Sequence, residues 1–190
     1  MARPKSEDKH KAILAAAIEL IAEQGVSAPT ARIAKLAGVA EGSLFTYFAS
    51  KDELLNQLYL SLKSELREAM MNRYPRKEST KNRLHHAWLV YVEWGVANPE
   101  KRKVMALLGM SERVSKESKA AGMEAFADIN ALLHEKGSDG AMRGHPPAFA
   151  AAIMGSLADT TMDFMAREPK QAQRYSEHGF DAFWNAIAKK

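Results

Sequence analysis

Apolar residues recur at helical spacing along almost the whole chain, and strict alternation of apolar and polar residues is nearly absent. In residues 10–25, for example, Ile13, Ala17 and Ile21 share one helical face, and Gly25 provides a stop signal. This pattern favours an all-α fold of about nine helices over any sheet-based fold. We expect these helices at residues 10–25, 30–36, 41–48, 51–74, 79–98, 99–108, 111–136, 148–168 and 170–190.

Three of the predicted helices follow a residue type that commonly caps helix N-termini. Ser6, Thr30 and Ser50 are the expected N-caps, because their side-chain oxygens can accept from backbone N–H groups of the first turn. Short helices give way to long ones just after Ser50. We therefore expect two domains, residues 1–50 and residues 51–190.

Charge and composition limit the class of protein without deciding its function. The 190 residues carry a formal charge of +4 with a pI near 9.2, which is compatible with a polyanionic partner but common among soluble proteins. The absence of cysteine excludes disulfides and thiolate metal sites. No apolar run approaches the ~18 residues of a membrane span. We expect a cytoplasmic protein with no membrane contact.

Residues 30–48 combine two short helical segments with a glycine between them. The first segment covers residues 30–36, Gly38 lies in the turn, and the second covers residues 41–48. Two short helices joined by a tight turn of this kind form a helix-turn-helix. Ala34 is small enough to let the second helix cross the first closely.

The second of these helices keeps small and hydroxyl-bearing side chains on its outer face. A recognition helix in a major groove needs small residues for close approach and hydroxyls that reach base edges or phosphates. Thr30, Lys51 and two arm residues, Arg3 and Lys5, could hold the phosphates. From spacing alone, a DNA-reading unit and a purely structural helical corner both remain open. The outward residues are Glu41, Gly42, Ser43, Thr46 and Tyr47, with Phe45 at the margin.

The same stretch resembles the signature of the TetR (tetracycline-repressor-like) bacterial transcription regulators. The resemblance covers about residues 10–56, and the rest of the chain agrees only in length and helical character. The matching positions are Thr30, Ile33, Ala34, Ala37, Gly38, Val39, Gly42, Ser43, Leu44, Phe45, Tyr47, Phe48, Ser50, Lys51 and Leu54.

This resemblance implies a homodimer that places two recognition helices in successive major grooves of a palindromic, double-stranded operator. It implies that Ser43 and Phe45 contact bases or a thymine methyl group, while Tyr47, Thr30 and Lys51 hold phosphates. It also implies a small-molecule effector, repression as the default mode, and a fourth helix that transmits effector binding to the recognition helix.

The chain departs from the family pattern at three positions of this segment. Position 41 is Glu where the family often has lysine, and a carboxylate there repels phosphate unless it accepts from a cytosine amino group. Thr46 replaces a commonly larger residue. Ala31 has no side chain that could read a base, and we expect Arg32 to take that role.

In this family the middle helices usually enclose the effector. Bulky and adaptable side chains gather in the middle of this chain, and methionine and aromatic residues suit a deformable apolar pocket. Each of them also fits an ordinary helical core, so both interpretations stay open for any single residue. The candidates are Trp88, Tyr91, Trp94, Met105, Leu108, Met110, Met123 and Phe126.

The last two helices are the family's usual dimer interface. Here they carry a stripe of small residues and a cluster of aromatic ones, which repeated by a two-fold axis would build a four-helix bundle. An intramolecular hairpin is the alternative. The candidate interface residues are Ala151, Gly155, Ala158, Met162, Phe180, Phe183, Trp184 and Ile187.

An enzyme is the main rival class. His85 and His86 are adjacent, so a helix would point them about 100° apart, which does not suit one shared metal ion. No nucleophile–base pair, phosphate loop or paired-carboxylate motif stands out. We therefore expect a ligand-responsive regulator with no catalytic site, metal or cofactor. The alternative is a helical ligand-binding protein or enzyme whose helix-turn-helix is only structural.

Overall fold

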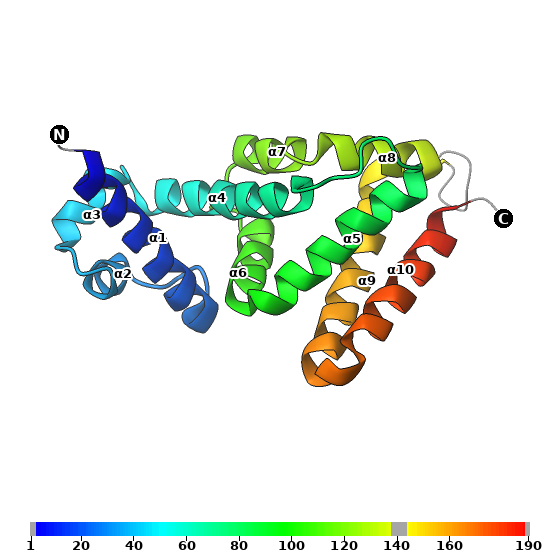
Figure 1. The fold of residues 1–190 in the computed structure, drawn as a ribbon. Coiled ribbons are helices and arrows are strands. Elements are labelled where there is room, and N and C mark those ends of the chain that lie inside the picture. Colours follow the sequence, from blue (N-terminus) through cyan, green and yellow to red (C-terminus); the bar gives the residue numbers. More distant parts are fainter. Residues whose placement is uncertain (1–2, 138–143, 189–190) are drawn as a thin grey trace. The chain divides into compact units, whose positions relative to one another are not determined.

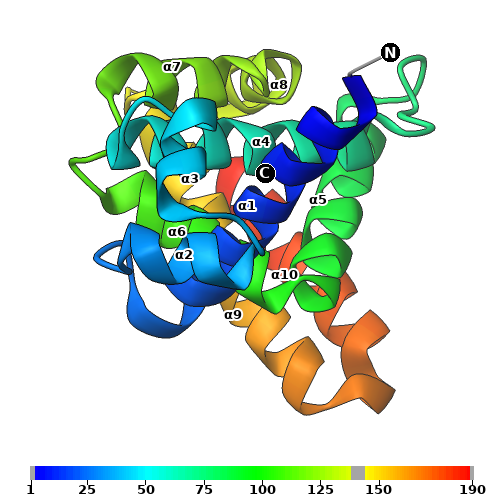
Figure 2. The same ribbon diagram turned by 90° about the vertical axis from the view of Figure 1, so that its left-hand side faces the viewer.

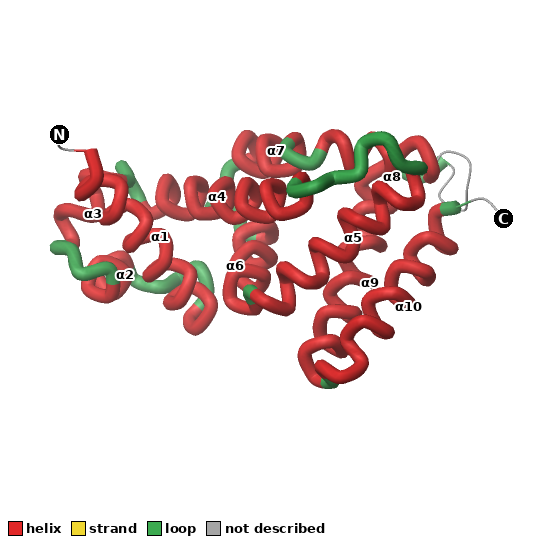
Figure 3. The backbone as a smooth tube through the Cα atoms, in the orientation of Figure 1, coloured by secondary structure: helices red, strands yellow, loops and turns green. Residues whose placement is uncertain are grey.

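The computed structural model describes residues 3–137 and 144–188, and these are almost entirely helical (Figure 3). The all-α prediction is confirmed, with ten α-helices and one short 3-10 helix in the described residues. The helices are α1 (Arg3–Gln24), α2 (Thr30–Leu36), α3 (Glu41–Tyr47), α4 (Lys51–Met71), α5 (Thr80–Ala97), α6 (Pro99–Met110), α7 (Lys116–Glu124), α8 (Ala127–Gly137), α9 (Pro147–Arg167), η1 (Pro169–Gln171) and α10 (Ala172–Ile187).

The chain packs as two compact units, whose helices can be followed in Figure 1. Unit 1 comprises residues 1–64 and 99–123, and unit 2 comprises residues 65–98 and 124–190. Both units are therefore built from two separate stretches of chain. A functional boundary after residue 50 stays a prediction.

Unit 1 is organised around α1, which packs against α2 and α6. Ile13, Ala17 and Ile21 are fully buried on the predicted face of α1. Gly25 ends the helix with a φ of +77°, in the left-handed region that favours glycine. The three N-terminal helices face the viewer in Figure 2.

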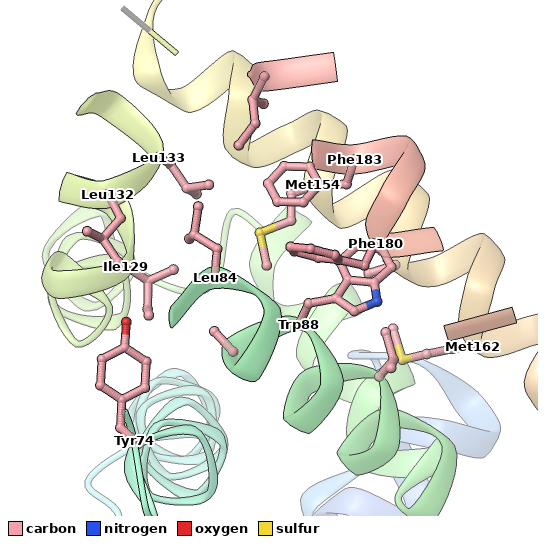
Figure 4. Close-up of a cluster of buried hydrophobic side chains, with 14 of the residues drawn as sticks. Tyr74, Leu84, Trp88, Ile129, Leu132, Leu133, Met154, Met162, Phe180 and Phe183 are labelled. Carbon is pink, nitrogen blue, oxygen red and sulfur yellow. The ribbon is translucent and has the colours of Figure 1, made fainter. Parts of the chain in front are cut away.

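Unit 2 packs α5, α8, α9 and α10 around a cluster of large apolar side chains (Figure 4). Trp88 is fully buried at its centre, with its ring stacked on Phe183 at a centroid distance of 5.8 Å. The Trp88 indole N–H donates to the Ser176 carbonyl at 3.0 Å, so its polar edge is satisfied inside the core. This core fixes α9 and α10 against α5.

Several predicted helix boundaries need correction. The first helix begins at Arg3, so Ser6 lies inside it and is not its N-cap. Pro29 occupies the N-cap position of α2, and Thr30 is the first helical residue. Ser50 does cap α4, because its Oγ accepts from the Glu53 backbone N–H at 3.1 Å.

The helix predicted over residues 111–136 is two helices, α7 and α8. The break falls at Ala125 and Phe126, where the Arg67 side chain of α4 donates to the Ala125 carbonyl at 2.5 Å. A side chain far from the break in sequence therefore binds a backbone carbonyl group at the break. The stretch before α7 is a turn, because Ser115 caps α7 through the Ser118 backbone N–H. The Arg67 contact, which joins residues 58 positions apart, is not visible in local sequence.

None of the described helices combines the length and the apolar character that crossing a membrane requires.

Candidate nucleic-acid interface

Helices α2 and α3 form the predicted helix-turn-helix and contact each other directly. Gly38 adopts a φ of +69° in the turn, and the Val39 backbone N–H donates to the Ala34 carbonyl at 3.0 Å. The left-handed conformation at Gly38 strains any residue with a side chain. The predicted turn and its glycine are therefore confirmed in backbone geometry.

Two fully buried side chains hold α3 against the rest of unit 1. Leu44 and Phe48 expose none of their surface. The His10 ring of α1 stacks on Phe48 at a centroid distance of 4.8 Å, and its Nε2 lies 3.1 Å from the Gln57 side-chain oxygen. The sequence analysis missed His10 and Gln57, which join α1 to α4 beside α3. A histidine one turn before an apolar helical face is the signal that could have drawn attention to it.

The remaining side chains of α3 reach solvent. Phe45 keeps 44% of its surface exposed. Tyr47 is half-buried. The structure therefore brings the predicted α3 residues onto one accessible element. The exposed positions are Glu41, Gly42, Ser43, Phe45 and Thr46.

Thr30 and Glu41 lie together although eleven residues separate them in sequence. The Thr30 hydroxyl donates to Glu41 Oε1 at 3.2 Å, joining the first residue of α2 to the first residue of α3. Arg32 is exposed, and its guanidinium donates to the Gln24 side chain at 3.0 Å. The guanidinium is therefore drawn toward the end of α1.

Lys51 stands at the first position of α4, directly after the recognition helix. Burial is the main cause that lowers the Lys51 pKa, and the nearby Arg113 guanidinium lowers it further. Asp52 acts in the opposite direction. Lys51 and Arg113 thus place two cations at the start of α4, with the Asp52 carboxylate beside them.

Arg113 is the site residue that the sequence analysis missed entirely. It lies between α6 and α7, and its Nε donates to Asp52 Oδ1 at 2.6 Å. Asn56 binds the same turn twice, donating to the Arg113 carbonyl at 3.2 Å and accepting from the Ser115 backbone N–H at 2.9 Å. These bonds attach the turn between α6 and α7 to the start of α4. The contact spans 61 residues, so no local signal could have revealed it.

Two predicted phosphate-binding residues, Arg3 and Lys5, belong to the first turn of α1. Their side chains lie outside the described residues, so their role in DNA binding stays a prediction.

The predicted effector residues occupy very different environments. Trp88 and Leu108 are fully buried by the chain, whereas Met110 is 76% exposed. Within unit 2, Trp94 donates its indole N–H to Glu65 at 3.2 Å, and Tyr91 and Phe126 are half-buried. Of the predicted effector residues, Met105 is buried and Met123 is exposed. Unit 1 contains four of them, namely Met105, Leu108, Met110 and Met123. Four of the eight residues belong to each unit, and a shared pocket for an effector stays a prediction.

Most of the predicted dimer-interface residues point into the core of unit 2. The chain itself covers five of them almost completely, so they have no surface to offer a second subunit. Ala151, Gly155 and Trp184 are half-buried. Inner and outer stripes of an apolar helix look alike in sequence, so the pattern alone does not separate core from interface. The five covered residues are Ala158, Met162, Phe180, Phe183 and Ile187.

The outer seam between α9 and α10 contains a shallow hollow of about 270 Å³. Phe164 borders it and is 40% exposed, and Phe149 at the start of α9 is 43% exposed. The hollow is lined by Thr160, Thr161, Phe164, Tyr175, His178 and Gly179.

The adjacent histidines have separate partners, as the helical geometry predicted. His85 Nε2 lies 2.9 Å from the Glu177 carboxylate, while His86 Nε2 lies 3.1 Å from the Met70 carbonyl. Within the described part of the chain, no three His, Asp or Glu side chains come together as a metal site.

Known proteins share both the local motif and the whole fold. Residues 13–58, which contain α2 and α3, match the family profile of the bacterial regulatory proteins of the tetR family. A tetR family transcription regulator from Shewanella sp. PV-4 superposes with a TM-score of 0.84 at 29% identity, over 96% of this chain and 99% of that one. The chain has the N-terminal domain and the fold of the TetR family.

Two further TetR-like matches concern fatty acids. The fatty acid metabolism regulator protein of Bacillus subtilis (strain 168) is 35% identical over 77 residues, which span 40% of either protein. The B. subtilis regulator FadR, solved in complex with stearoyl-CoA, superposes with a TM-score of 0.71 over 93% of this chain and 98% of its own. Its identity is 21%, so this likeness concerns the TetR fold alone. TetR-family proteins are transcription regulators and not enzymes, which confirms the prediction of a non-catalytic chain.

Proposed function

We propose that this TetR-family protein binds a palindromic operator as a homodimer and represses transcription until a small-molecule effector releases it. The observation that carries the proposal is α3 itself, because Leu44 and Phe48 anchor it while its small and hydroxyl-bearing residues stay exposed. A helix enters a major groove more closely when its exposed side chains are small. Cytoplasmic action beside its operator is part of the same proposal.

Lys51 and Arg113 support a phosphate-binding role at the end of the recognition helix. Two neighbouring cations repel each other in the free protein, which contributes to the lowered Lys51 pKa. A bound phosphate would relieve this repulsion and favour the charged form of Lys51. Association with DNA would therefore stabilise an arrangement that costs energy in its absence.

The outer faces of α9 and α10 are the surface that we assign to the homodimer. Phe149 and Phe164 leave large apolar areas in solvent, and Phe164 borders the hollow beside Gly179. Burial of such side chains is the main driving force of subunit association. A four-helix bundle built from two copies of this seam replaces the inward-facing interface that the sequence suggested.

We assign an anionic, amphipathic molecule as the effector class. Lys63 of α4 has its pKa lowered by burial, and its ammonium lies 5.5 Å from the centre of the Tyr59 ring. Burial favours the neutral form of this amine, and a negative group bound beside it would favour the charged form. The stearoyl-CoA bound by FadR, an acyl chain with an anionic head, is one molecule of this class.

Helix α4 is the proposed link between effector and operator. Its first residue is Lys51, and its first turn is bound to Arg113 in the turn between α6 and α7. A ligand that shifts α6 or α7 would pull on Asp52 and Asn56 and thereby move the end of the recognition helix. Release requires that the effector bind one of the two arrangements more tightly.

Binding to DNA fragments from around its own gene, titrated with salt, tests the proposal. We expect a fragment that binds at least a hundredfold more tightly than random DNA, with an affinity that falls steeply as salt rises. Addition of stearoyl-CoA should weaken that specific complex. A chain that binds no DNA at low salt would be a helical ligand-binding protein with a structural corner instead.

A further inference from the structure

The pair formed by Thr30 and Glu41 is unusual for a surface that meets a polyanion. Glu41 begins α3, its side chain is exposed, and its carboxylate would face DNA if α3 enters the major groove. A free carboxylate at that place would be repelled by phosphates. The hydrogen bond from the Thr30 hydroxyl to Oε1 instead holds this carboxylate in a set position.

We propose that Glu41 is a specificity-determining residue that reads a cytosine in each operator half-site, with Thr30 as its positioning residue. The inference rests on the proposed DNA-binding function. One carboxylate oxygen accepts from Thr30, which leaves the other oxygen as an acceptor for a base edge. The Thr30 hydroxyl donates its hydrogen to Glu41, so it cannot donate to a phosphate at the same time.

The choice of base follows from what each base presents in the major groove. An ionised carboxylate can only accept hydrogen bonds. Guanine presents two acceptors, N7 and O6, and thymine presents the O4 acceptor and a methyl group, so both disfavour a carboxylate. Adenine presents a donor beside the N7 acceptor, which would repel the carboxylate in part. Cytosine presents its N4 amino group as a donor and is the base that fits.

The same geometry gives Glu41 a second effect on discrimination. A carboxylate on the DNA-facing surface weakens binding to every sequence that offers no donor to it, because phosphate repulsion is then uncompensated. Loss of the charge should therefore raise the affinity for random DNA while lowering the preference for the operator. A side chain with a merely structural role would not produce this opposite pair of changes.

Selection of half-sites from a randomised DNA pool by the full-length protein tests the assignment, with Glu41→Gln as the decisive variant. Glutamine both accepts and donates, and it pairs with the N6 and N7 atoms of adenine. We expect one position of the half-site to change from cytosine in the wild type to adenine in Glu41→Gln. At that position the wild type should prefer cytosine by about tenfold or more. Glu124→Gln, which removes an exposed carboxylate at the end of α7, is the matched control and should select the wild-type sequence.

Thr30→Val separates positioning from phosphate contact, because it removes the hydroxyl and keeps the shape. We expect the cytosine preference to weaken severalfold while affinity for random DNA stays unchanged. A uniform loss of affinity for all sequences would instead show that Thr30 binds phosphate, and would overturn its positioning role. Circular dichroism melting of each variant confirms that it folds.

The outcomes also distinguish this inference from the proposed function. If the wild type enriches no sequence at all, the proposed operator binding fails. If the wild type selects an operator and Glu41→Gln selects the same base at every position, operator binding stands and the assignment of Glu41 is wrong.

Discussion

Replacing Gly179 with alanine is expected to destabilise this protein, although alanine is the better helix former. An alanine Cβ at this position of α10 would lie 2.3 Å from Thr161 Oγ1 and 2.8 Å from Trp88 Cζ2. Both distances are far shorter than van der Waals contact. Helix α10 must shift away from α5 and α9, or both neighbouring side chains must leave their positions.

Neither neighbour of Gly179 can move easily. Thr161 is buried and its hydroxyl donates to the Leu157 carbonyl at 2.8 Å. Trp88 is fully buried, bonded to the Ser176 carbonyl and stacked on an aromatic neighbour. Overpacking of a rigid core costs up to about 3 kcal/mol, against a gain of about 1 kcal/mol from helix propensity. We therefore expect a net loss of about 2 kcal/mol in the free energy of unfolding, with the overpacking term the larger.

Gly109→Ala is the matched control, because Gly109 also lies inside a helix and no atom comes within 4 Å of its added Cβ. It should gain about 1 kcal/mol from helix propensity. For a chain of this size, the melting temperature should fall by about 4–8 °C in Gly179→Ala and rise by about 2–4 °C in the control. Urea unfolding followed by circular dichroism, at one fixed protein concentration, measures both variants.

A second substitution tests the contact itself. Thr161→Ala removes the two atoms of Thr161 that the new methyl group would meet. In the Gly179→Ala background it should cost less than it does alone, and a double-mutant cycle measures this coupling. If Gly179→Ala is as stable as Gly109→Ala, the close packing of α9 on α10 inferred here is wrong.

Two further predictions concern DNA binding and assembly. Operator affinity should fall as the pH rises toward the lowered pKa of Lys51, because phosphate binding favours the charged amine. Lys51→Arg should flatten this pH dependence in a fluorescence anisotropy titration. An equal decline of affinity in both proteins would exclude Lys51 as its source. Phe164→Glu should convert the proposed dimer to a monomer in sedimentation velocity, because it places a charge on the exposed apolar seam of α9. Lys116→Glu, which changes an exposed residue of α7, should remain dimeric. A dimeric Phe164→Glu would refute the outer-seam interface.

The helix-turn-helix could be predicted from sequence almost residue by residue. Its helices are short, its turn needs a glycine at positive φ, and both signals are local. The face of α1 that contains Ile13 and Ile21 was equally predictable, because helical periodicity identifies which residues share a side. Phe45, which the sequence places at the margin of the outer face, is 44% exposed, whereas Leu44 and Phe48 are buried as predicted.

Contacts between residues far apart in sequence could not be predicted in this way. The hydrogen bond from Thr30 to Glu41 depends on how tightly the turn brings two helices together. The attachment of Arg113 to Asp52 depends on the path of all the chain between them. The break between α7 and α8 coincides with a hydrogen bond from Arg67 to the Ala125 carbonyl, which no helix propensity of the broken segment records.

The all-helical class, the helix-turn-helix and the apolar faces of the helices can be predicted from sequence alone, because each follows from spacing along one segment. Which apolar face the chain covers with its own residues and which stays exposed depends on the tertiary packing. Ala158 and Phe183 have the composition of an interface and lie in the core, whereas Phe164 remains exposed. Periodicity gives a helix its apolar side, but burial depends on what packs against that side in three dimensions.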